Sequence, residues 1–529
     1  MKKIKYTILS FATISFLLLS AIETMAQKNE YTFERIEQLS PWLKSNNGAG
    51  LVFNGATENF STVYGYYNNI NGKFRNYNEP ESLNNFGIAT KSYSKLNKFY
   101  FYGMFNYDYT IRKNQSWLGT IYPNSTLAPI VENVPGKVLD EVYEIGTKIA
   151  YKANKSISAG ISFDYKDATA AKRKDGRNKN TFSDLFVSPS VAIKTNNINL
   201  GLSLIYGYNK EKVAYKYIGD ATGLYMYYME GLFMYTSNTI TSTGMILERL
   251  YAKNLYGASI QAELHFGKFS FYNDFTAKIS RQNHYEESYF AKRYAYNDAL
   301  EYDYKGVVRI ACDKMEHNLN IGFNSSENHL YNITNIYEEI SGENGLWEYF
   351  EYGNTLRYTS WAKTTDVSYN GLTKRSLFLP NIEYTLGFRF SDIEKTHKIY
   401  PSVYSQQIFK REYYAVLSKS FITNDKGYIN AELNGAMSNG NGTPIEIVNP
   451  LSDGAIQCKE DLLAIDYAYN TSKKYNLGLS LKYVRYINKE KQMNMWIKGA
   501  YFYNKVSDTL LKFEGNNRNN IRITVGIDF

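Results

Sequence analysis

Cysteine is nearly absent from this sequence, which has only Cys312 and Cys458 among its 529 residues. Disulfide bonds therefore cannot be what holds so long a chain together, and no cysteine stands near the amino terminus, where a lipid anchor would need one. Histidine is scarce as well, and no two histidines have the spacing of a metal-binding pair, so we expect no zinc site. The five histidines are His265, His284, His317, His329 and His397.

Long apolar runs are also missing, apart from one at the amino terminus. No other segment approaches the roughly 20 apolar residues that a membrane-spanning helix needs, so a helical membrane protein is excluded. The single run, Ile8 to Ile22, follows three lysines within the first five residues and leads into the small-residue pattern Thr24-Met25-Ala26. These features predict a secretory signal peptide over residues 1–26, with cleavage before Gln27. A retained amino-terminal anchor is the less favoured alternative.

Catalytic motifs are largely lacking too. The sequence has no Gly-x-Ser-x-Gly elbow, no His-Glu-x-x-His and no phosphate-binding glycine loop. We therefore predict no enzyme activity, no cofactor and no metal. Outer-membrane hydrolases assemble their catalytic groups from separate strands, so an enzyme stays open as the least favoured alternative, with His265 beside Glu263 as its best candidate. A hydrogen-bonded histidine near a turn is the simpler interpretation of His265.

The balance of charge does not point to a nucleic acid. The formal charge is +9, and it falls to +7 without residues 1–26, which contain three lysines and one glutamate. A small surplus on so large a chain, with basic residues scattered among acidic ones, gives no coherent basic face. The densest basic group, residues 172–179, lies in an expected loop beside Asp175, and we interpret it as solvated.

Tyrosine, in contrast, is abundant, with 51 residues against 10 prolines and a hydrophobic content of 44%. A transmembrane barrel uses tyrosine at both membrane interfaces, where the ring lies among acyl chains and the hydroxyl among headgroups. Carbohydrate-binding β-proteins are also rich in aromatic residues. The composition therefore favours an outer-membrane barrel over a secreted soluble protein but leaves both open.

The last nine residues alternate apolar and polar side chains and end on an aromatic carboxy terminus. A strand with lipid on one side and a wet lumen on the other repeats with period two, as this segment does. Residues 522, 524, 526 and 528 would face the lumen. The residues that would face lipid are Ile521, Ile523, Val525, Ile527 and Phe529.

The same alternation recurs in residues 157–165, 198–206, 256–266 and 475–483. Each segment has one apolar face and an opposite face of glycine, serine and charged residues, which suits a barrel interior better than the inner face of a sandwich. We therefore predict an all-β fold consisting of a single antiparallel transmembrane barrel. Its inward-facing ionisable residues could select a solute or pair with one another. They are Asp164, Glu263, His265, Lys482, Arg522 and Asp528.

The connections between strands are expected to alternate, with short turns in the periplasm and long loops outside the cell. We count 18 to 20 strands, with 16 as a further option. Short turns are predicted near residues 96–97, 153–155, 196–197, 267–268 and 313–314. Long loops are predicted near 110–140, 168–182, 211–253, 281–302 and 328–351. Between 352 and 460 the order is less regular, with short connections at 391–396 and 422–427 and a long one at 438–459.

One barrel is expected to fill residues 52–529, with no linker or low-complexity tract. The preceding residues 27–51 are expected to lie in the periplasm or in the lumen, with a helical turn from Phe33 to Leu39. A segment of this length cannot form the globular plug of an energised outer-membrane receptor. The length therefore argues against a TonB-dependent transporter, unless a separate chain supplies the plug.

The two ends of the chain resemble known proteins. Residues Pro41–Leu51, the expected cleavage before Gln27 and the tyrosine-rich last strand are similar to exported barrels of Bacteroidota, most of all to a functionally uncharacterised family of about 500 residues. The resemblance implies an outer-membrane location, in contact with outer-membrane lipid. It also implies that the barrel-insertion machinery reads the last strand, through Ile521, Ile523, Val525, Ile527 and Phe529.

The stretch Asn46-Asn47-Gly48-Ala49-Gly50-Leu51 also resembles the Asn-Pro-Ala-Gly-Leu sequence in the amino-terminal hatch of fatty-acid-type outer-membrane channels. This chain departs from that pattern, because it has Asn47-Gly48 in place of Asn-Pro. The resemblance implies a hydrophobic solute that leaves sideways through the barrel wall. The alternative is that these residues are a flexible lead into the first strand.

Three classes of function remain. The first is a channel or uptake component for a solute that the sequence does not name, since a barrel of this circumference encloses space. The alternative is a non-enzymatic scaffold or surface-binding partner of another envelope protein, in a transport or secretion complex, with loops 211–253 and 281–302 as contact surfaces. The aromatic residues of 225–235 would bind a protein, a glycan or another ligand, or extend the barrel wall above the membrane, and we favour wall extension. An outer-membrane enzyme comes last.

Overall fold

The computed structural model describes residues 33–53, 59–123, 125–218, 224–240, 246–286, 292–340, 345–374, 379–424, 426–451, 456–488, 493–507 and 513–529. The predicted signal peptide lies outside these residues. Within them, no helix is both long enough and apolar enough to cross a membrane.

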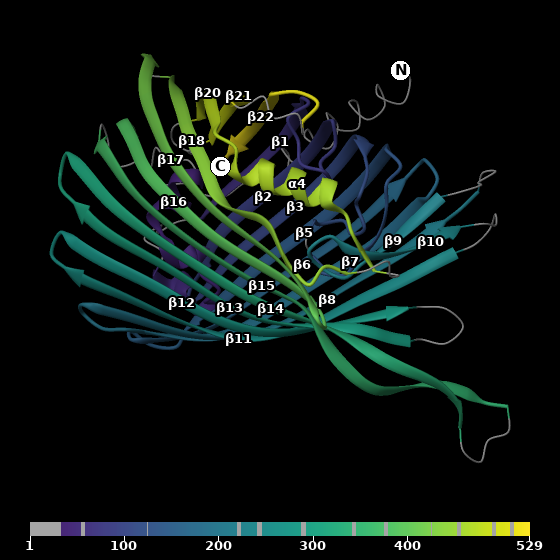
Figure 1. Ribbon diagram of the computed structural model, residues 1–529. Coiled ribbons are helices and arrows are strands. Elements are labelled where there is room, and N and C mark those ends of the chain that lie inside the picture. The colour runs from purple at the N-terminus through teal and green to yellow at the C-terminus, as the bar shows by residue number, and fades with distance from the viewer. Residues whose placement is uncertain are drawn as a thin grey trace.

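Eighteen antiparallel strands form one closed barrel, because the first strand pairs with the last (Figure 1). β1 (Phe60–Asn71) pairs with β22 (Asn517–Asp528), and each other barrel strand pairs with the barrel strands before and after it in the chain. The predicted all-β barrel is confirmed, and its strand number lies within the predicted range. The remaining strands are β2 (Ser82–Leu96), β3 (Phe99–Gln115), β5 (Gly136–Lys152), β6 (Ile157–Lys172), β7 (Arg177–Lys194), β8 (Ile198–Lys216), β11 (Ile246–Phe266), β12 (Phe269–Glu286), β13 (Lys292–Ala311), β14 (Met315–Glu339), β15 (Trp347–Lys374), β16 (Pro380–Ile399), β17 (Ser402–Asn424), β18 (Gly427–Val448), β20 (Lys474–Asn488) and β21 (Met493–Val506).

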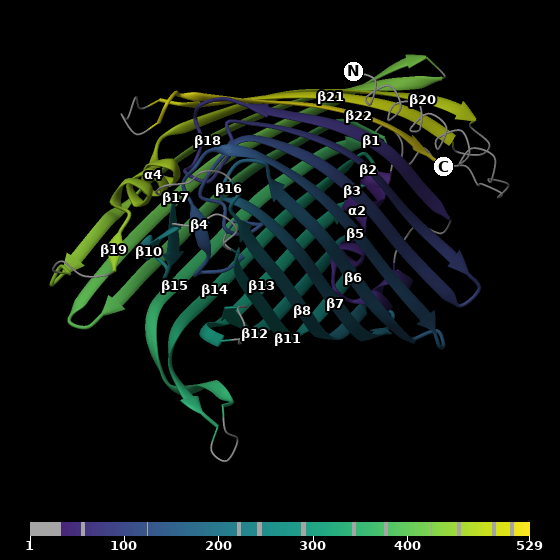
Figure 2. The ribbon, with the colours of Figure 1, turned by 90° about the vertical axis from the view of Figure 1, so that its right-hand side faces the viewer.

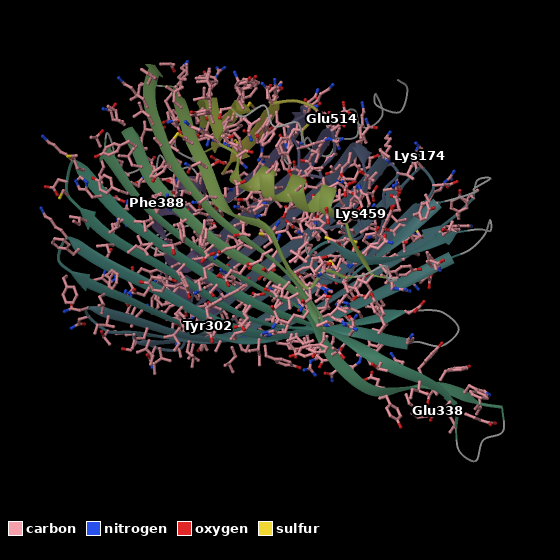
Figure 3. The ribbon with its side chains drawn as sticks, viewed as in Figure 1. Lys174, Tyr302, Glu338, Phe388, Lys459 and Glu514 are labelled. Carbon is pink, nitrogen blue, oxygen red and sulfur yellow. The ribbon has the colours of Figure 1, made fainter. Side chains whose placement is uncertain are left out.

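Period-two alternation gives the wall its two faces. On β20, Leu477 is 62% exposed on the outer face while Ser480 is 2% exposed on the inner face. Tyr302 and Phe388 project from the outside of the wall in the same way (Figure 3). Leaving so many aliphatic and aromatic side chains in water would cost about 25 cal/mol per Å² of apolar surface. A closed barrel with this outer face points to an outer-membrane protein.

Short turns gather at one end of the barrel, which we call the turn end. All five short turns predicted before residue 352 are found between strands, and so is the one at 422–427. Asn97 (φ 54°) and Gly267 (φ 61°) adopt the left-handed conformation that such tight turns need. The opposite end carries the longer connections together with two short ones, at 173–176 and 400–401, and we call it the loop end.

Several predicted loop boundaries are wrong because strands continue where loops were expected. Residues 168–182 are mostly strand, since β6 ends at Lys172 and β7 begins at Arg177. The predicted connection at 391–396 lies inside β16, and the chain turns at Tyr400-Pro401. Beyond the membrane both faces of a strand are wet, so the apolar alternation ends while the backbone ladder continues. A hydrophobic pattern therefore marks the membrane-facing part of each strand and not its end.

The loop end contains a second, four-stranded sheet and a helix. The sheet consists of β4 (Ile130–Glu132), β9 (Leu224–Met229), β10 (Met234–Ile240) and β19 (Gln457–Cys458), and the helix is α4 (Glu460–Thr471). Wall extension by residues 225–235 was therefore wrong, because these residues form a separate sheet that packs against inward-facing side chains of the barrel. Tyr227, Phe233 and Tyr235 are buried in this packing, whereas Tyr225 is exposed.

The segment before the barrel lies inside it. It contains α2 (Phe33–Leu39), α3 (Pro41–Lys44) and the 3-10 helix η2 (Gly48–Phe53), so the predicted helical turn is present. Figure 2 shows α2 behind the strands of the near wall. We call residues 33–53 the lumenal segment.

Candidate functional site: the occupied lumen

Polar contacts to the wall hold α3 in place. Trp42 is 1% exposed, and its Nε1 donates to Oε2 of Glu263 on β11 at 2.7 Å. Lys148 on β5 donates through Nζ to the backbone oxygens of Leu43 and Ser45, at 2.6 Å each. Carbonyls at the carboxyl end of a helix have no intrahelical partner, so the buried ammonium group satisfies them.

The Asn47–Leu51 stretch is pressed against β5, β6 and β7, and Asn47 also reaches β11. Asn47 is fully buried, and its Nδ2 donates to Oε1 of Gln261 at 2.9 Å. The backbone of Ala49 donates to Oγ of Ser190 at 3.0 Å and accepts from Oγ of Ser158 at 3.2 Å. The interpretation of this stretch as a flexible lead is therefore wrong, because its backbone is bonded to the wall.

Glycine is required where this stretch meets the wall. A Cβ added to Gly48 would lie 2.6 Å from backbone atoms of Ile161, and one added to Gly160 would lie 2.4 Å from the backbone nitrogen of Ala49. Two backbones can approach this closely only when neither carries a side chain at the contact. The glycines therefore fix where the lumenal segment sits on β6.

The wall is interrupted close to this contact. The β7–β8 ladder pairs Val187 with Tyr206 and then Ser190 with Ser203, and Pro189 between them has no N–H to donate. Asn47 Nδ2 donates to the backbone oxygen of Val191, two residues farther along β7, at 3.2 Å. The lumenal segment thus adds a hydrogen bond beside the place where the barrel has lost one.

Ion pairs tie α2 to opposite sides of the barrel. Glu37 pairs with Lys91 on β2 at 2.8 Å, and Arg35 pairs with Glu316 on β14 at 3.9 Å. In the ring of 18 strands, β2 and β14 are nine places apart and so face each other. The lumenal segment therefore crosses the lumen instead of lining one wall.

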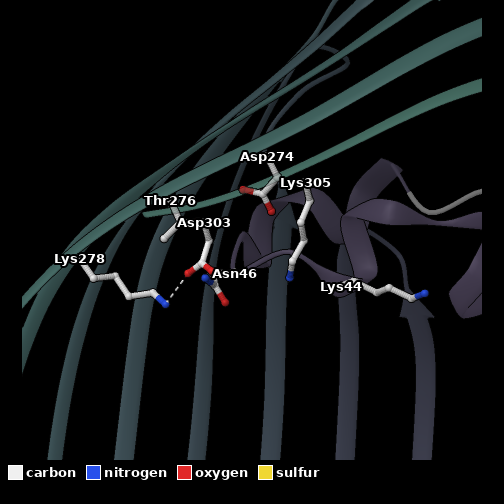
Figure 4. A pocket seen from close by; sticks show the side chains of 7 residues that line it. All are labelled: Lys44, Asn46, Asp274, Thr276, Lys278, Asp303 and Lys305. Atoms are coloured by element: carbon white, nitrogen blue, oxygen red, sulfur yellow. Dashed lines mark hydrogen bonds and ion pairs between the residues drawn. The ribbon is translucent and has the colours of Figure 1, made fainter. Parts of the chain in front are cut away.

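A charged pocket lies between the lumenal segment and β12 and β13 (Figure 4). Its volume is about 190 Å³. Lys278 forms an ion pair with Asp303 at 2.9 Å, and Asp303 also accepts from Asn324 at 2.6 Å. The side chains around it are Lys44, Asn46, Asp274, Thr276, Lys278, Asp303 and Lys305.

One glutamine connects this pocket to the lumenal segment. Gln261 is fully buried; its Oε1 accepts from Asn47, and its Nε2 donates to Oδ1 of Asp274 at 3.0 Å. A ligand that moved Asp274 would disturb the amide that holds Asn47. The pocket is therefore linked to the segment through Gln261, in addition to Lys44 and Asn46 of the segment, which line the pocket themselves.

At the loop end, connecting segments pack on inward-facing residues of the wall. Leu232, Phe233 and Met234 pack with inward residues of four strands, and α4 adds Leu462 and Leu463 to the same cluster. The wall residues are Ala295, Leu330, Tyr358 and Tyr404. The lumen is thus occupied by the chain at both ends.

An aromatic cage joins the connections that pack at the loop end, which we call the cover (β4, β9, β10, β19 and α4). Nζ of Lys459, before α4, lies 4.9 Å from the ring centre of Tyr227, 5.3 Å from Tyr235 and 5.7 Å from Trp117. These rings come from β9, β10 and the β3–β5 connection, so one cation holds three connections together.

We expect Cys458, next to this cage, to react slowly with alkylating reagents. Burial, with a smaller effect of Glu460 and Asp461, raises the pKa of its thiol to about 12, and the thiolate is the reactive form. In a Cys312→Ser background, iodoacetamide uptake followed by mass spectrometry should rise roughly tenfold per pH unit between pH 8 and 10. A rate at pH 8 equal to that of free glutathione would contradict the buried cover.

Four of the six predicted lumen-facing residues form two groups, Glu263 with His265 and Lys482 with Asp528. Glu263 holds Trp42, accepts from Asn199 at 2.9 Å and lies 3.4 Å from His265, which is 45% exposed on its side chain. Lys482 pairs with Glu34 at 3.4 Å and lies over Trp496, whose Nε1 donates to Asp528 at 3.0 Å. Arg522 lies over the ring of Tyr66, and Asp164 is on β6. Among the described residues, no group of three or more side chains could hold a metal ion.

Sequence reasoning missed Lys148, Gln261 and Lys91, although each stands at an inward position of an alternating strand. Alternation shows on which side of the wall a side chain lies. It does not show how far along the barrel the side chain lies or which residue it contacts.

The sequence matches a family described as of unknown function, DUF6850, over residues 48–529. The chain belongs to this family. A comparison with curated proteins finds no match.

Several solved structures match most of this chain at low similarity. The outer-membrane transporter YddB from Escherichia coli has 8% identity over 89% of this chain and 81% of its own, with a TM-score of 0.39. The copper transporter OprC has the same identity and coverage and a TM-score of 0.37. A Pseudomonas aeruginosa FadL homologue has 10% identity over 96% of this chain and 99% of its own, with a TM-score of 0.31.

Proposed function

We propose that this protein is a gated uptake channel of the outer membrane, with the lumenal segment as its gate. An 18-stranded barrel encloses more space than its own wall side chains fill. Here that space is crossed by residues 33–53, from Lys91 on one side to Glu316 on the other. A solute can pass only when this segment moves. The crossing of the lumen by this segment is the observation that carries the proposal.

The contacts of the segment suit a gate. Its polar contacts are single hydrogen bonds and ion pairs, each of which contributes about 1 kcal/mol and can be exchanged for water, while its apolar side chains Phe33, Ile36, Leu43 and Leu51 pack against wall residues. A permanent plug would be expected to have a larger apolar core of its own. We take the loop end as extracellular, so the cover around α4 opens first and the lumenal segment second.

We further propose that the solute is polar. The pocket beside the segment is lined by three lysines, two aspartates, a threonine and an asparagine. Such a lining favours a small hydrophilic solute over the hydrophobic one that the resemblance to fatty-acid-type channels implies. The link from Asp274 through Gln261 to Asn47 would let a bound solute loosen the segment.

A reversible tether tests the gate. In a Cys312→Ser, Cys458→Ser background, Glu37→Cys and Lys91→Cys place thiols where an ion pair now joins α2 to β2. A short bifunctional methanethiosulfonate should then suppress channel openings of the purified protein in planar bilayers, and dithiothreitol should restore them. The Lys91→Cys single variant, treated alike, is the control. Openings that persist unchanged under the tether would show that the segment is not the gate.

The alternative function is a scaffold in an envelope complex. The filling of the lumen from both ends favours a scaffold, because a barrel with a purely structural role needs no route for a solute through its lumen. Bilayers that stay silent before and after reduction, with the same protein recovered in a stable envelope complex, would support the scaffold over the channel.

A further inference from the structure

Two strands continue beyond the barrel as a free ribbon. β14 pairs with β13 only as far as Asn332 opposite Ala295, and β15 pairs with β16 only from Tyr358 opposite His397. Past those points the two strands pair with each other alone, up to Glu339 opposite Trp347. Figures 1 and 2 show this hairpin projecting away from the loop end of the barrel. We call residues 333–340 and 345–356 the acidic ribbon.

The ribbon carries charge of one sign. Glu338, Glu339, Glu348 and Glu351 lie on it, and its described residues include no lysine or arginine, although the whole chain has a net charge of +9. Glu338 stands directly opposite Glu348 in the ladder, and Figure 3 places Glu338 far from the barrel. Like charges opposite each other destabilise a strand pair. A cationic group between them would remove that repulsion.

The same ribbon exposes aromatic side chains. Tyr337 stacks on Trp347 at 5.4 Å and lies 4.8 Å from Tyr349, all on one face. On the other face, next to the two opposed glutamates, Ile336 stands opposite Phe350, which is 40% exposed. Exposed aromatic residues grouped on a projecting element are typical of surfaces that bind another protein.

We propose that the acidic ribbon is the docking site of a protein whose contacting surface is basic and carries apolar side chains. Charge complementarity decides the class of partner. Anionic lipid headgroups and nucleic acids would be repelled by the opposed carboxylates, whereas lysine or arginine side chains would neutralise them.

Folding physics supports the same assignment. A two-stranded ribbon with nothing packed on it is only marginally stable in water. Here the facing glutamates weaken it further. β13 supports its base, where Arg293 pairs with Glu351 at 2.6 Å and Nζ of Lys292 lies 5.2 Å from the ring centre of Tyr349. A partner that covers one face would therefore stabilise the ribbon as well as bind it. This inference does not depend on whether the barrel conducts.

Site-specific photo-crosslinking in cells of the natural host tests the proposal. A benzoylphenylalanine at Phe350 should give one protein adduct whose crosslinked peptide is rich in lysine and arginine. Glu338→Lys with Glu348→Lys should lower the adduct yield at least about tenfold, and Glu338→Gln with Glu348→Gln should lower it less. The same photoprobe at Tyr413, which is 50% exposed on the outer wall, is the control and should not give this adduct.

Other outcomes would overturn the inference. These are no protein adduct at Phe350, an adduct insensitive to charge reversal, an adduct with lipopolysaccharide or with a second copy of this chain, or the same adduct from Tyr413. Heat-modifiable migration in gels reports whether each variant forms its barrel, and the glutamine pair keeps the test valid if charge reversal impairs folding. Channel measurements on the same variants should be unchanged, so failure here is distinguishable from failure of the gate.

Discussion

Replacing Gly48 with alanine should release the lumenal segment and open the channel. The new Cβ would lie 2.6 Å from the backbone of Ile161, which cannot move without disrupting β6. The segment has to shift instead, and three hydrogen bonds around it are lost, those of Asn47 with Gln261 and of Ala49 with Ser190 and Ser158. At about 1 kcal/mol each, their loss should favour the open state by roughly 100-fold.

Single-channel recording in planar bilayers measures this shift as open probability. Gly499→Ala is the matched control, because a Cβ there meets nothing within 4 Å, and its openings should equal those of the unaltered protein. Both variants should keep the barrel, as heat-modifiable migration would show. A Gly48→Ala protein with intact barrel and unaltered open probability would mean that this contact does not control the lumen.

Deleting Phe529 should prevent most of the protein from assembling in the membrane. Phe529 closes the barrel seam, because its nitrogen donates to the oxygen of Ser61 at 2.9 Å and its oxygen accepts from the nitrogen of Ser61 at 2.7 Å. We also propose that its ring, with Ile521, Ile523, Val525 and Ile527, forms the signal read by the barrel-insertion machinery. The yield of heat-modifiable protein in outer-membrane fractions should fall at least several-fold.

Two substitutions separate these roles of Phe529. Phe529→Tyr keeps both the aromatic ring and the seam hydrogen bonds, so its yield should be normal. Phe529→Ala keeps the hydrogen bonds and lacks the ring, so its yield should resemble that of the deletion if the ring is the signal. A normal yield for Phe529→Ala would mean that only the backbone hydrogen bonds with Ser61 matter, and it would refute the proposed role of the ring as a signal.

The barrel itself was predictable because its physical cause repeats along the chain. Lipid on one side and water on the other impose period two on every membrane-facing strand, and segments such as 198–206 and 256–266 show it plainly. Tight turns such as that at Gly267 were predictable for the same reason, since they interrupt the pattern with residues that accept a left-handed backbone. The positions at which strands end at the loop end could not be predicted, because the alternating pattern stops at the membrane surface whereas the strands continue beyond it.

The candidate site was predictable only in part. Glu263 and Lys482 were expected to face inward, and they do contact the lumenal segment, through Trp42 and Glu34. Their partners stand 221 and 448 residues away in the chain. Nothing in the alternation of a strand records such distant neighbours, so their roles could not be read from it.

The sequence by itself determined the fold class, the inward and outward faces of the strands and the presence of an amino-terminal segment outside the barrel pattern. Only the tertiary structure decided that this segment crosses the lumen, that the four-stranded sheet of β4, β9, β10 and β19 packs inside the opening and that β14 and β15 project as an acidic ribbon. The physical reason is that the side of the wall to which a side chain points follows from the two-residue repeat of its own strand. The other arrangements depend on contacts between segments that barrel closure brings together. The close approach of Gly48 to Ile161 is such a contact, and no local pattern specifies it.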